Sequence, residues 1–266
     1  MEVRWEYLTP PEFKKLVREE KVCILPIGSL ERHGDHMPFG TDALVAHDIA
    51  VRVAKKEPCV VFPPYWFGEV HCASCFTGTV NFSAEELCRM LQNLLDQIAQ
   101  NGFQKIMILN AHGGNQAFLH YFMMTQLSRE VDYALYQVFY ASGKRFKALD
   151  IWDEPMGGHA DENETSLMMA IAPDSVKLEQ QTIQEPILPK CDLARLDGVY
   201  TGLWWYDQYP ENVTGMPSYA TPEKGEIALN AAAEDVAEKL RAIKEDTQYP
   251  RLQKEFYTRR REMKDV

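Results

Sequence analysis

Two spacings of apolar positions alternate along the 266-residue chain. Four short runs of nearly continuous apolar residues are typical of strands that are buried on both faces. These expected strands cover residues 21–28, 59–64, 105–110 and 134–140. Elsewhere, apolar residues recur three and four positions apart, which is typical of amphipathic helices. These expected helices cover residues 10–20, 43–56, 84–100, 116–130 and 226–243.

Residues that start and stop helices support these boundaries. Thr9 and Pro10 can begin the first helix, and Ser83 with Glu86 forms a capping box for the third. That helix is expected to end near Gly102. Because strands and helices alternate, we predict an α/β fold: a three-layer α/β/α sandwich with a mostly parallel central sheet.

The periodic pattern weakens after residue 172. A long loop-rich stretch with many Pro and Gly residues follows, and it ends at Thr221-Pro222, which can cap the last helix. No internal repeat, low-complexity segment or clear linker divides the sequence. We therefore expect residues 1–266 to form a single domain.

Charge and composition narrow the class of protein. The formal net charge of −11 argues against a nucleic acid or an anionic membrane as partner, because both require clustered Lys and Arg. No apolar run approaches the ~20 residues of a membrane span, and the first residues lack the pattern of a secretory signal. Six scattered cysteines predict free thiols in a reducing compartment, by default the cytoplasm. We expect the basic end, YTRRREMKDV, to be solvated.

Three clusters of ligand-type side chains stand out, two of them after expected strands and the third before the apolar helical run LMMAIA at residues 167–172. They are ERHGDHMPFGTD at residues 31–42, NAHGGN at residues 110–115 and GHADENETS at residues 158–166. In open α/β sheets, ligands bind at the carboxyl ends of strands, and the first two clusters follow strands. Glu31 and His33 are two residues apart, so an extended segment points both to one side, and Asp42 can fold back toward them.

The chemistry of these side chains indicates a metal site. Imidazole and carboxylate together suit Zn, Mn or Fe(II) better than Ca or Mg, which prefer shells of oxygen alone. A carboxylate can also bridge two cations, so the site could hold two metal ions. Other chemistries have less support: Cys72 and Cys75 lack the second pair that a zinc knuckle needs, and no dinucleotide fingerprint, P-loop or nucleophile elbow occurs.

LPIGSLERHGDHMPFGTD, NAHGGN and HADENETS occur in that order along the chain. They resemble the patterns P-x-G-S-x-E-Q-H-G-x-H-L-P-x-x-T-D, N-G-H-G-G-N and H-A-G-E-x-E-T-S of the creatininase (creatinine amidohydrolase) family. The order and spacing agree from about residue 5 to residue 245. The resemblance implies a binuclear metal-dependent hydrolase of small-molecule substrates, commonly assembled as a hexamer, so we expect a homo-oligomer.

Carried over residue by residue, the resemblance implies a set of metal ligands. Glu31 and His112 would bind one ion, His33 would bind the other, and Asp42 would bridge them. The two ions would be Zn, Mn or Fe.

The creatinine-hydrolysing branch has a fifth ligand where this chain has Gly114, a Glu two positions after the His of the second pattern. We expect Glu162 of the third cluster to replace that carboxylate. His159 resembles the family's proton-transfer residue, and Glu164 would orient that His or a ligand. An exchange of roles between Glu162 and Glu164 stays open.

The resemblance also limits the reactions and substrates that we expect. A metal-bridging hydroxide would attack an amide or cyclic amide, that is, a carbon–nitrogen bond outside ordinary peptides. The glycines at positions 113 and 114 argue against creatinine itself as substrate. Alternatives are carbon–carbon hydrolysis of a cyclic polyol diketone derived from an inositol, formamide deformylation and peptide trimming. A purely structural metal site is disfavoured, because such sites are usually rich in Cys.

Overall fold

The computed structural model describes residues 2–154, 158–182, 191–192 and 196–263. A four-stranded sheet lies at its centre, and every strand pair in it is parallel, in the order β2–β1–β3–β4. The strands are β1 (Val22–Ile27), β2 (Val60–Val61), β3 (Lys105–Asn110) and β4 (Ala134–Phe139). Parallel strands need long crossovers, and helices supply them here.

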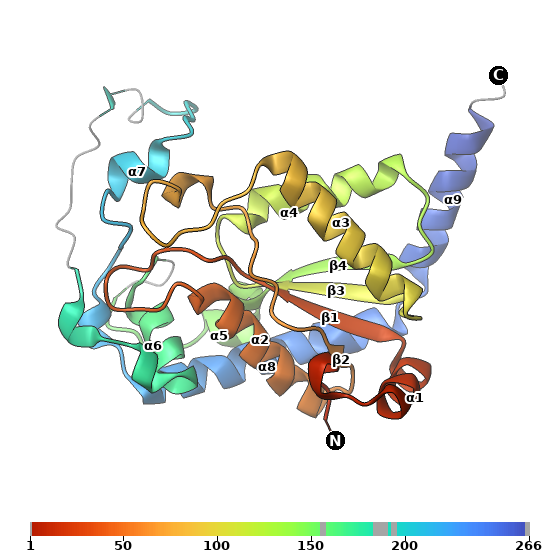
Figure 1. The fold of residues 1–266 in the computed structure, drawn as a ribbon, viewed down its shortest axis with the longest axis horizontal. Helices are drawn as coiled ribbons and strands as arrows, with labels where there is room; N and C mark the ends of the chain where they lie inside the picture. Colours follow the sequence, from red (N-terminus) through yellow and green to blue (C-terminus); the bar gives the residue numbers. More distant parts are fainter. Residues whose placement is uncertain (1, 155–157, 183–190, 193–195, 264–266) are drawn as a thin grey trace.

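Helices cover both faces of this sheet (Figure 1). Helices α2 (Thr41–Lys56) and α8 (Pro222–Glu245) lie on one face, and α3 (Ala84–Gln100) and α4 (Asn115–Thr125) lie on the other. The other α-helices are α1 (Pro10–Glu20), α5 (Lys144–Lys147), α6 (Glu162–Ile171), α7 (Trp204–Gln208) and α9 (Gln248–Glu262). Short 3-10 helices span Trp5–Tyr7, His71–Ala73, Gln126–Ser128, Tyr140–Ser142, Pro173–Ser175, Leu178–Gln180 and Pro217–Tyr219.

Each face of the sheet has its own apolar core. Successive side chains of a strand point to opposite faces, so Ile24 enters the core on the α2 and α8 side while Leu25 enters the core beneath α3 and α4. Met107 and Ile108 of β3 divide in the same way. The predicted three-layer α/β fold with a parallel central sheet is therefore confirmed.

Some boundaries differ from those predicted. The strand expected over residues 59–64 has only two residues, because Pro63 and Pro64 carry no N–H to donate. The basic end is helical as far as Glu262, and apart from Tyr257 its described residues are exposed or half-buried, as expected of a solvated segment. The buried Tyr257 anchors it by donating a hydrogen bond from its hydroxyl to the carbonyl oxygen of Gln126, at 3.0 Å.

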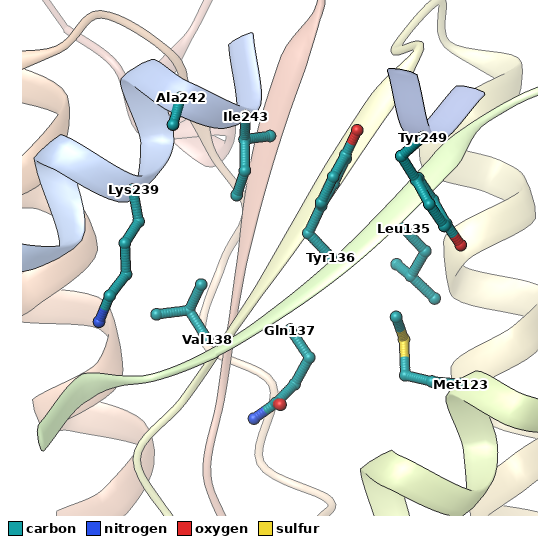
Figure 2. Close-up of a pocket in the computed structure, with 9 residues that line it drawn as sticks. All are labelled: Met123, Leu135, Tyr136, Gln137, Val138, Lys239, Ala242, Ile243 and Tyr249. Carbon is teal, nitrogen blue, oxygen red and sulfur yellow. The ribbon is translucent and has the colours of Figure 1, made fainter. Parts of the chain in front are cut away.

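The edge strand β4 borders a cavity of about 550 Å³ (Figure 2). Its lining is mostly apolar, with Met123, Leu135, Val138 and Ile243 among the side chains in view. The amine of Lys239, at one side of this cavity, donates to the Ser142 hydroxyl at 2.8 Å. None of the groups of metal-ligand side chains that the described residues form includes a residue of this cavity.

Two further expectations concern thiols and membranes. All six cysteines are free thiols, as the scattered spacing predicted. Within the described part of the chain, no helix has the length and apolar character needed to span a bilayer.

Candidate metal centre

The sheet brings the first two ligand clusters together. Ile27 at the end of β1 pairs with Asn110 at the end of β3, so residues 28–42 and 111–114 leave the sheet side by side. The end of β1 also packs directly against the first turn of α2, because a Cβ atom on Gly28 would lie 2.2 Å from the amide nitrogen of Ala43. This close approach places Asp42, in the first turn of α2, beside both clusters.

Asp42 is buried between two imidazoles. Its Oδ1 lies 3.1 Å from Nε2 of His33, and its Oδ2 lies 2.9 Å from Nδ1 of His112. The Ser29 hydroxyl also donates to Oδ2, at 2.7 Å. Each oxygen of one carboxylate therefore faces a different histidine, which is the arrangement expected of a ligand that bridges two cations.

Among the described residues, ligand-type atoms gather into groups that share Asp42. One group is Glu31, Asp42 and His112, and another is His33, Asp42 and Glu164. Glu31 and His33 also form a group with His159. Within each group the candidate ligand atoms all lie within 4.8 Å of one another, so the structure brings residues from all three sequence clusters to one place.

Glu31 carries an unsatisfied oxygen in this centre. Its side chain is buried, and Oε2 makes no hydrogen bond with any described residue although it lies 3.2 Å from Nδ1 of His112. Burying a carboxylate oxygen without a partner is costly, and a cation removes that cost. The donor set and the free oxygen thus fit a divalent metal.

Backbone carbonyls fix the orientation of both imidazoles. Nδ1 of His33 donates to the carbonyl oxygen of Glu31 at 3.0 Å, which leaves Nε2 facing the centre. Nε2 of His112 donates to the carbonyl oxygen of Glu69 at 2.7 Å, which leaves Nδ1 facing the centre. Hydrogen bonds of this kind to the outer nitrogen orient metal-binding histidines.

The two histidines and Asp42 perturb one another's ionisation. Burial alone would lower the pKa of His33, but Asp42 outweighs it and raises that pKa to about 10. Burial would also lower the pKa of His112, but Asp42 again outweighs it and raises that pKa to about 9. Burial would raise the pKa of Asp42, yet the two histidines hold it well below its usual range. Asp42 is therefore ionised, and the extra proton on each of the two histidines lies where a cation would bind.

The structure separates Glu162 from Glu164. The Glu162 carboxylate forms an ion pair with Lys224 and accepts hydrogen bonds from the backbone nitrogens of Asp153, at 2.9 Å, and Glu154, at 3.1 Å. By contrast, Oε2 of Glu164 lies 3.6 Å from Nε2 of His33. Residues two apart on a helix are about 200° apart around its axis, so only one of the two can face the centre.

His159 is buried at the border of the centre. Its Nδ1 lies 3.8 Å from Oε2 of Glu164, and its Nε2 lies 3.8 Å from Oε1 of Glu31. Nε2 also donates to the carbonyl oxygen of Arg32 at 3.0 Å. The ring therefore sits next to both ligand groups with a defined orientation.

Asn212 is a site residue that sequence reasoning missed. Its buried Nδ2 donates to the carbonyl oxygen of Arg32 at 2.6 Å, and it lies 3.3 Å from Oε1 of Glu31 and 3.1 Å from Nε2 of His159. Nε1 of Trp205 donates to Oδ1 of Asn212 at 2.6 Å, which fixes the orientation of the amide. The only sequence signal was the aromatic and polar composition of residues 204–221.

Glu69 is a second missed residue, because a backbone carbonyl has no signature in the sequence. Its contact with His112 also explains Gly114: a Cβ atom there would lie 2.6 Å from Nε2 of His112 and 2.8 Å from the carbonyl oxygen of Glu69. Any side chain at position 114 would therefore disturb this hydrogen bond.

A cavity of about 540 Å³ opens onto the centre. Glu31, His112, His159 and Glu164 line it, together with Trp205. Its walls come from the ends of β3 and β4 and from α5, α6 and α7, which lie beyond the carboxyl ends of the strands (Figure 1).

Comparison with known proteins identifies the family of this chain. A family model for creatininase, described as creatinine amidohydrolase, matches residues 6–240. The creatinine amidohydrolase of Pseudomonas putida is 27% identical over 245 residues, which is 83% of this chain and 88% of that protein. The 3-dehydro-scyllo-inosose hydrolase of Thermotoga maritima is 25% identical over 267 residues, covering 91% of this chain and 84% of that protein.

The fold is also shared with solved creatininases. A mutant creatininase described as the Zn–Zn type superposes with a TM-score of 0.76 at 23% identity, covering 92% of this chain and all of that one. Since the family model spans most of the sequence, the chain belongs to the creatininase (creatinine amidohydrolase) family of hydrolases.

Proposed function

We propose that this protein is a binuclear metal-dependent hydrolase that acts on an amide or a cyclic amide. The observation that carries the proposal is Asp42, whose two oxygens face His33 and His112 in two separate groups of candidate ligands. A structural metal site has no need of the spare histidine, His159, at the border of the centre.

The proposed ligands divide into two sets that share Asp42. Glu31 and His112 would hold one ion with it, and His33 and Glu164 would hold the other. Glu164 thus takes the place that the sequence expectation gave to Glu162. Mixed imidazole and carboxylate ligands suit Zn, Mn or Fe(II), and the related creatininase of the Zn–Zn type supports two ions.

When bound, two divalent ions lower the pKa of a water molecule and polarise the substrate carbonyl. This chain's residues supply the proton transfers. With a hydrogen on Nε2 of His159 that donates to the Arg32 carbonyl, the neutral ring would offer Nδ1, on the side of Glu164, to accept a proton from the attacking water. His159 would then deliver that proton to the leaving nitrogen. Asn212 holds the same Arg32 carbonyl and so steadies the ring.

A second candidate function is hydrolysis of a carbon–carbon bond in a cyclic polyol ketone. The inosose hydrolase of Thermotoga maritima, similar over 91% of this chain, favours it. The same residues would act on a ketone carbonyl, and His159 would deliver its proton to the leaving carbon.

Turnover by zinc- or manganese-reconstituted protein tests the proposal. The panel consists of lactams, formamides, creatinine and cyclic polyol ketones, with Asp42→Asn protein as the matched control. Chelator-sensitive turnover of a carbon–nitrogen substrate supports the amidohydrolase, and turnover of a cyclic ketone alone supports the second candidate. Full activity in chelator or in Asp42→Asn would overturn both.

A further inference from the structure

We propose that the substrate of this cavity carries an anionic group, a carboxylate or a phosphate, which Lys147 and Asn163 bind. The proposal rests on the proposed function only in taking the cavity beside the metal centre as the substrate site. Both side chains line that cavity, and neither belongs to the candidate ligand groups.

Lys147 is an unpaired cation on the cavity wall. The residue is exposed, and its amine has no hydrogen bond or ion pair with the residues that the structure describes. Burial lowers the pKa of the neighbouring Lys239 amine, and the like charge of Lys147 lowers it further. The acidic residues in the same cavity are engaged elsewhere: Glu31 and Glu164 face the centre, and Asp161 accepts hydrogen bonds from backbone nitrogens. Lys147 is therefore available to a ligand.

The backbone at Lys147 is held in place from outside the cavity. Helix α5 has only four residues, too few to persist alone. The buried Asp235 of α8 accepts hydrogen bonds from the backbone nitrogens of Phe146, at 3.0 Å, and Arg145, at 3.3 Å. The Phe146 side chain is itself buried. These contacts fix where the Lys147 side chain starts.

Asn163 supplies an independent sign of a polar ligand. Its side chain is 6% exposed, and its Oδ1 has no hydrogen-bond partner among the described residues. A buried amide without a hydrogen-bond partner destabilises a fold unless another molecule forms a hydrogen bond with it. Because an amide offers an oxygen on one side and an NH₂ group on the other, rotation of the group lets it donate to an anion.

The first turn of α4 borders the same cavity. Gly113, Gly114 and Gln116 line it, and no side chain caps this 11-residue helix. The N-terminus of a helix carries unpaired N–H groups and partial positive charge, which favour an anion. An amine, an amide and a helix end from three separate segments thus line one cavity, and all three are chemical groups that bind carboxylates and phosphates.

Two pairs of small amides test the proposal, each pair differing in charge at one group. The first is 5-oxoproline against 5-oxoprolinamide, and the second is N-formylethanolamine phosphate against N-formylethanolamine. Dissociation constants are measured by calorimetry on zinc-loaded protein, without turnover. We expect the charged member of at least one pair to bind about tenfold more tightly, and the favoured pair identifies carboxylate or phosphate.

Variants of α5 distinguish the contribution of Lys147 to anion binding from that of the metal ions, which also attract anions. Lys147→Met should abolish the preference for the charged member, and Lys147→Arg should keep it. Lys144→Met, on the same helix but outside the cavity lining, should also keep it. The proposal is overturned if wild-type protein shows no preference or no binding at millimolar probe, or if the preference survives in Lys147→Met. A preference that depends on Lys147 in a protein without hydrolase activity would retain the anion site and reject the proposed function.

Discussion

Glu162 and Glu164 lie two residues apart on α6, yet their carboxylates serve different parts of the molecule. Glu164 places Oε2 3.6 Å from Nε2 of His33, whereas Glu162 forms an ion pair with Lys224. Asp161 fixes this division by capping the helix, since its side chain accepts a hydrogen bond from the backbone nitrogen of Glu164 at 2.9 Å. The first turn of α6 thus presents one acidic residue to the metal centre and the other to α8.

The two residues should respond differently to substitution by Gln. Glu164→Gln should lower bound metal, because it removes a proposed charged ligand. Glu162→Gln should keep the metal but lower the free energy of unfolding by roughly 1–3 kcal/mol, because it removes the buried charge that pairs with Lys224 and leaves that amine only the more exposed Asp153 carboxylate. Elemental analysis and thermal unfolding measure the two effects. The opposite pattern would return the ligand role to Glu162.

His159→Ala should separate metal binding from catalysis. We expect the variant to keep its metal content and to lose at least about 100-fold in kcat, because it removes the proposed proton carrier and no proposed ligand. Metal analysis beside steady-state kinetics gives both values. Loss of metal together with activity would make His159 a ligand instead.

Metal binding should release protons at neutral pH. Burial opposes the charged form of both histidines, but Asp42 prevails and raises the pKa of His33 to about 10 and that of His112 to about 9. Both rings therefore carry an extra proton at pH 7 in metal-free protein, and a ligand imidazole must be neutral. We expect release of about two protons on binding, and affinity that rises with pH toward these values.

Calorimetry in buffers of different ionisation enthalpy counts the released protons. Asp42→Asn protein is unsuitable as a comparison because it should lose the metal itself. The control is Asp48→Asn, whose half-buried carboxylate on α2 pairs with Arg52. Metal affinity that stays constant between pH 6 and about 9 would contradict the predicted competition.

Trp205→Phe should weaken catalysis through Asn212. The substitution keeps an aromatic ring but removes the Nε1 donor that lies 2.6 Å from Oδ1 of Asn212. Because a hydrogen bond of this kind contributes about 1 kcal/mol, we expect kcat to fall about fivefold with metal content unchanged. The comparison is Trp204→Phe, because Trp204 also lines the cavity but is more exposed. Equal effects of both substitutions on kcat would assign Trp205 to the pocket wall alone.

The sequence by itself determined the fold class and the place of the chemistry. Apolar runs such as residues 105–110 must be buried on both faces, so they predict parallel strands, and ligand-type residues after a strand must lie at its carboxyl end. Glu31, His33, Asp42 and His112 could therefore be placed together before any coordinates were known. The bridging capacity of a carboxylate already allowed two metal ions, and the family patterns made two ions the expectation.

Only the tertiary structure decided which partners complete the centre. The register of α6 depends on its cap at Asp161, and this register turns Glu164 rather than Glu162 toward His33. Asn212 contacts the carbonyl oxygen of Arg32, although the two residues lie 180 positions apart in the sequence. The Glu69 carbonyl orients His112 from a loop with no periodic pattern. Such contacts arise from how distant segments pack, and local spacing along the chain carries no information about that packing.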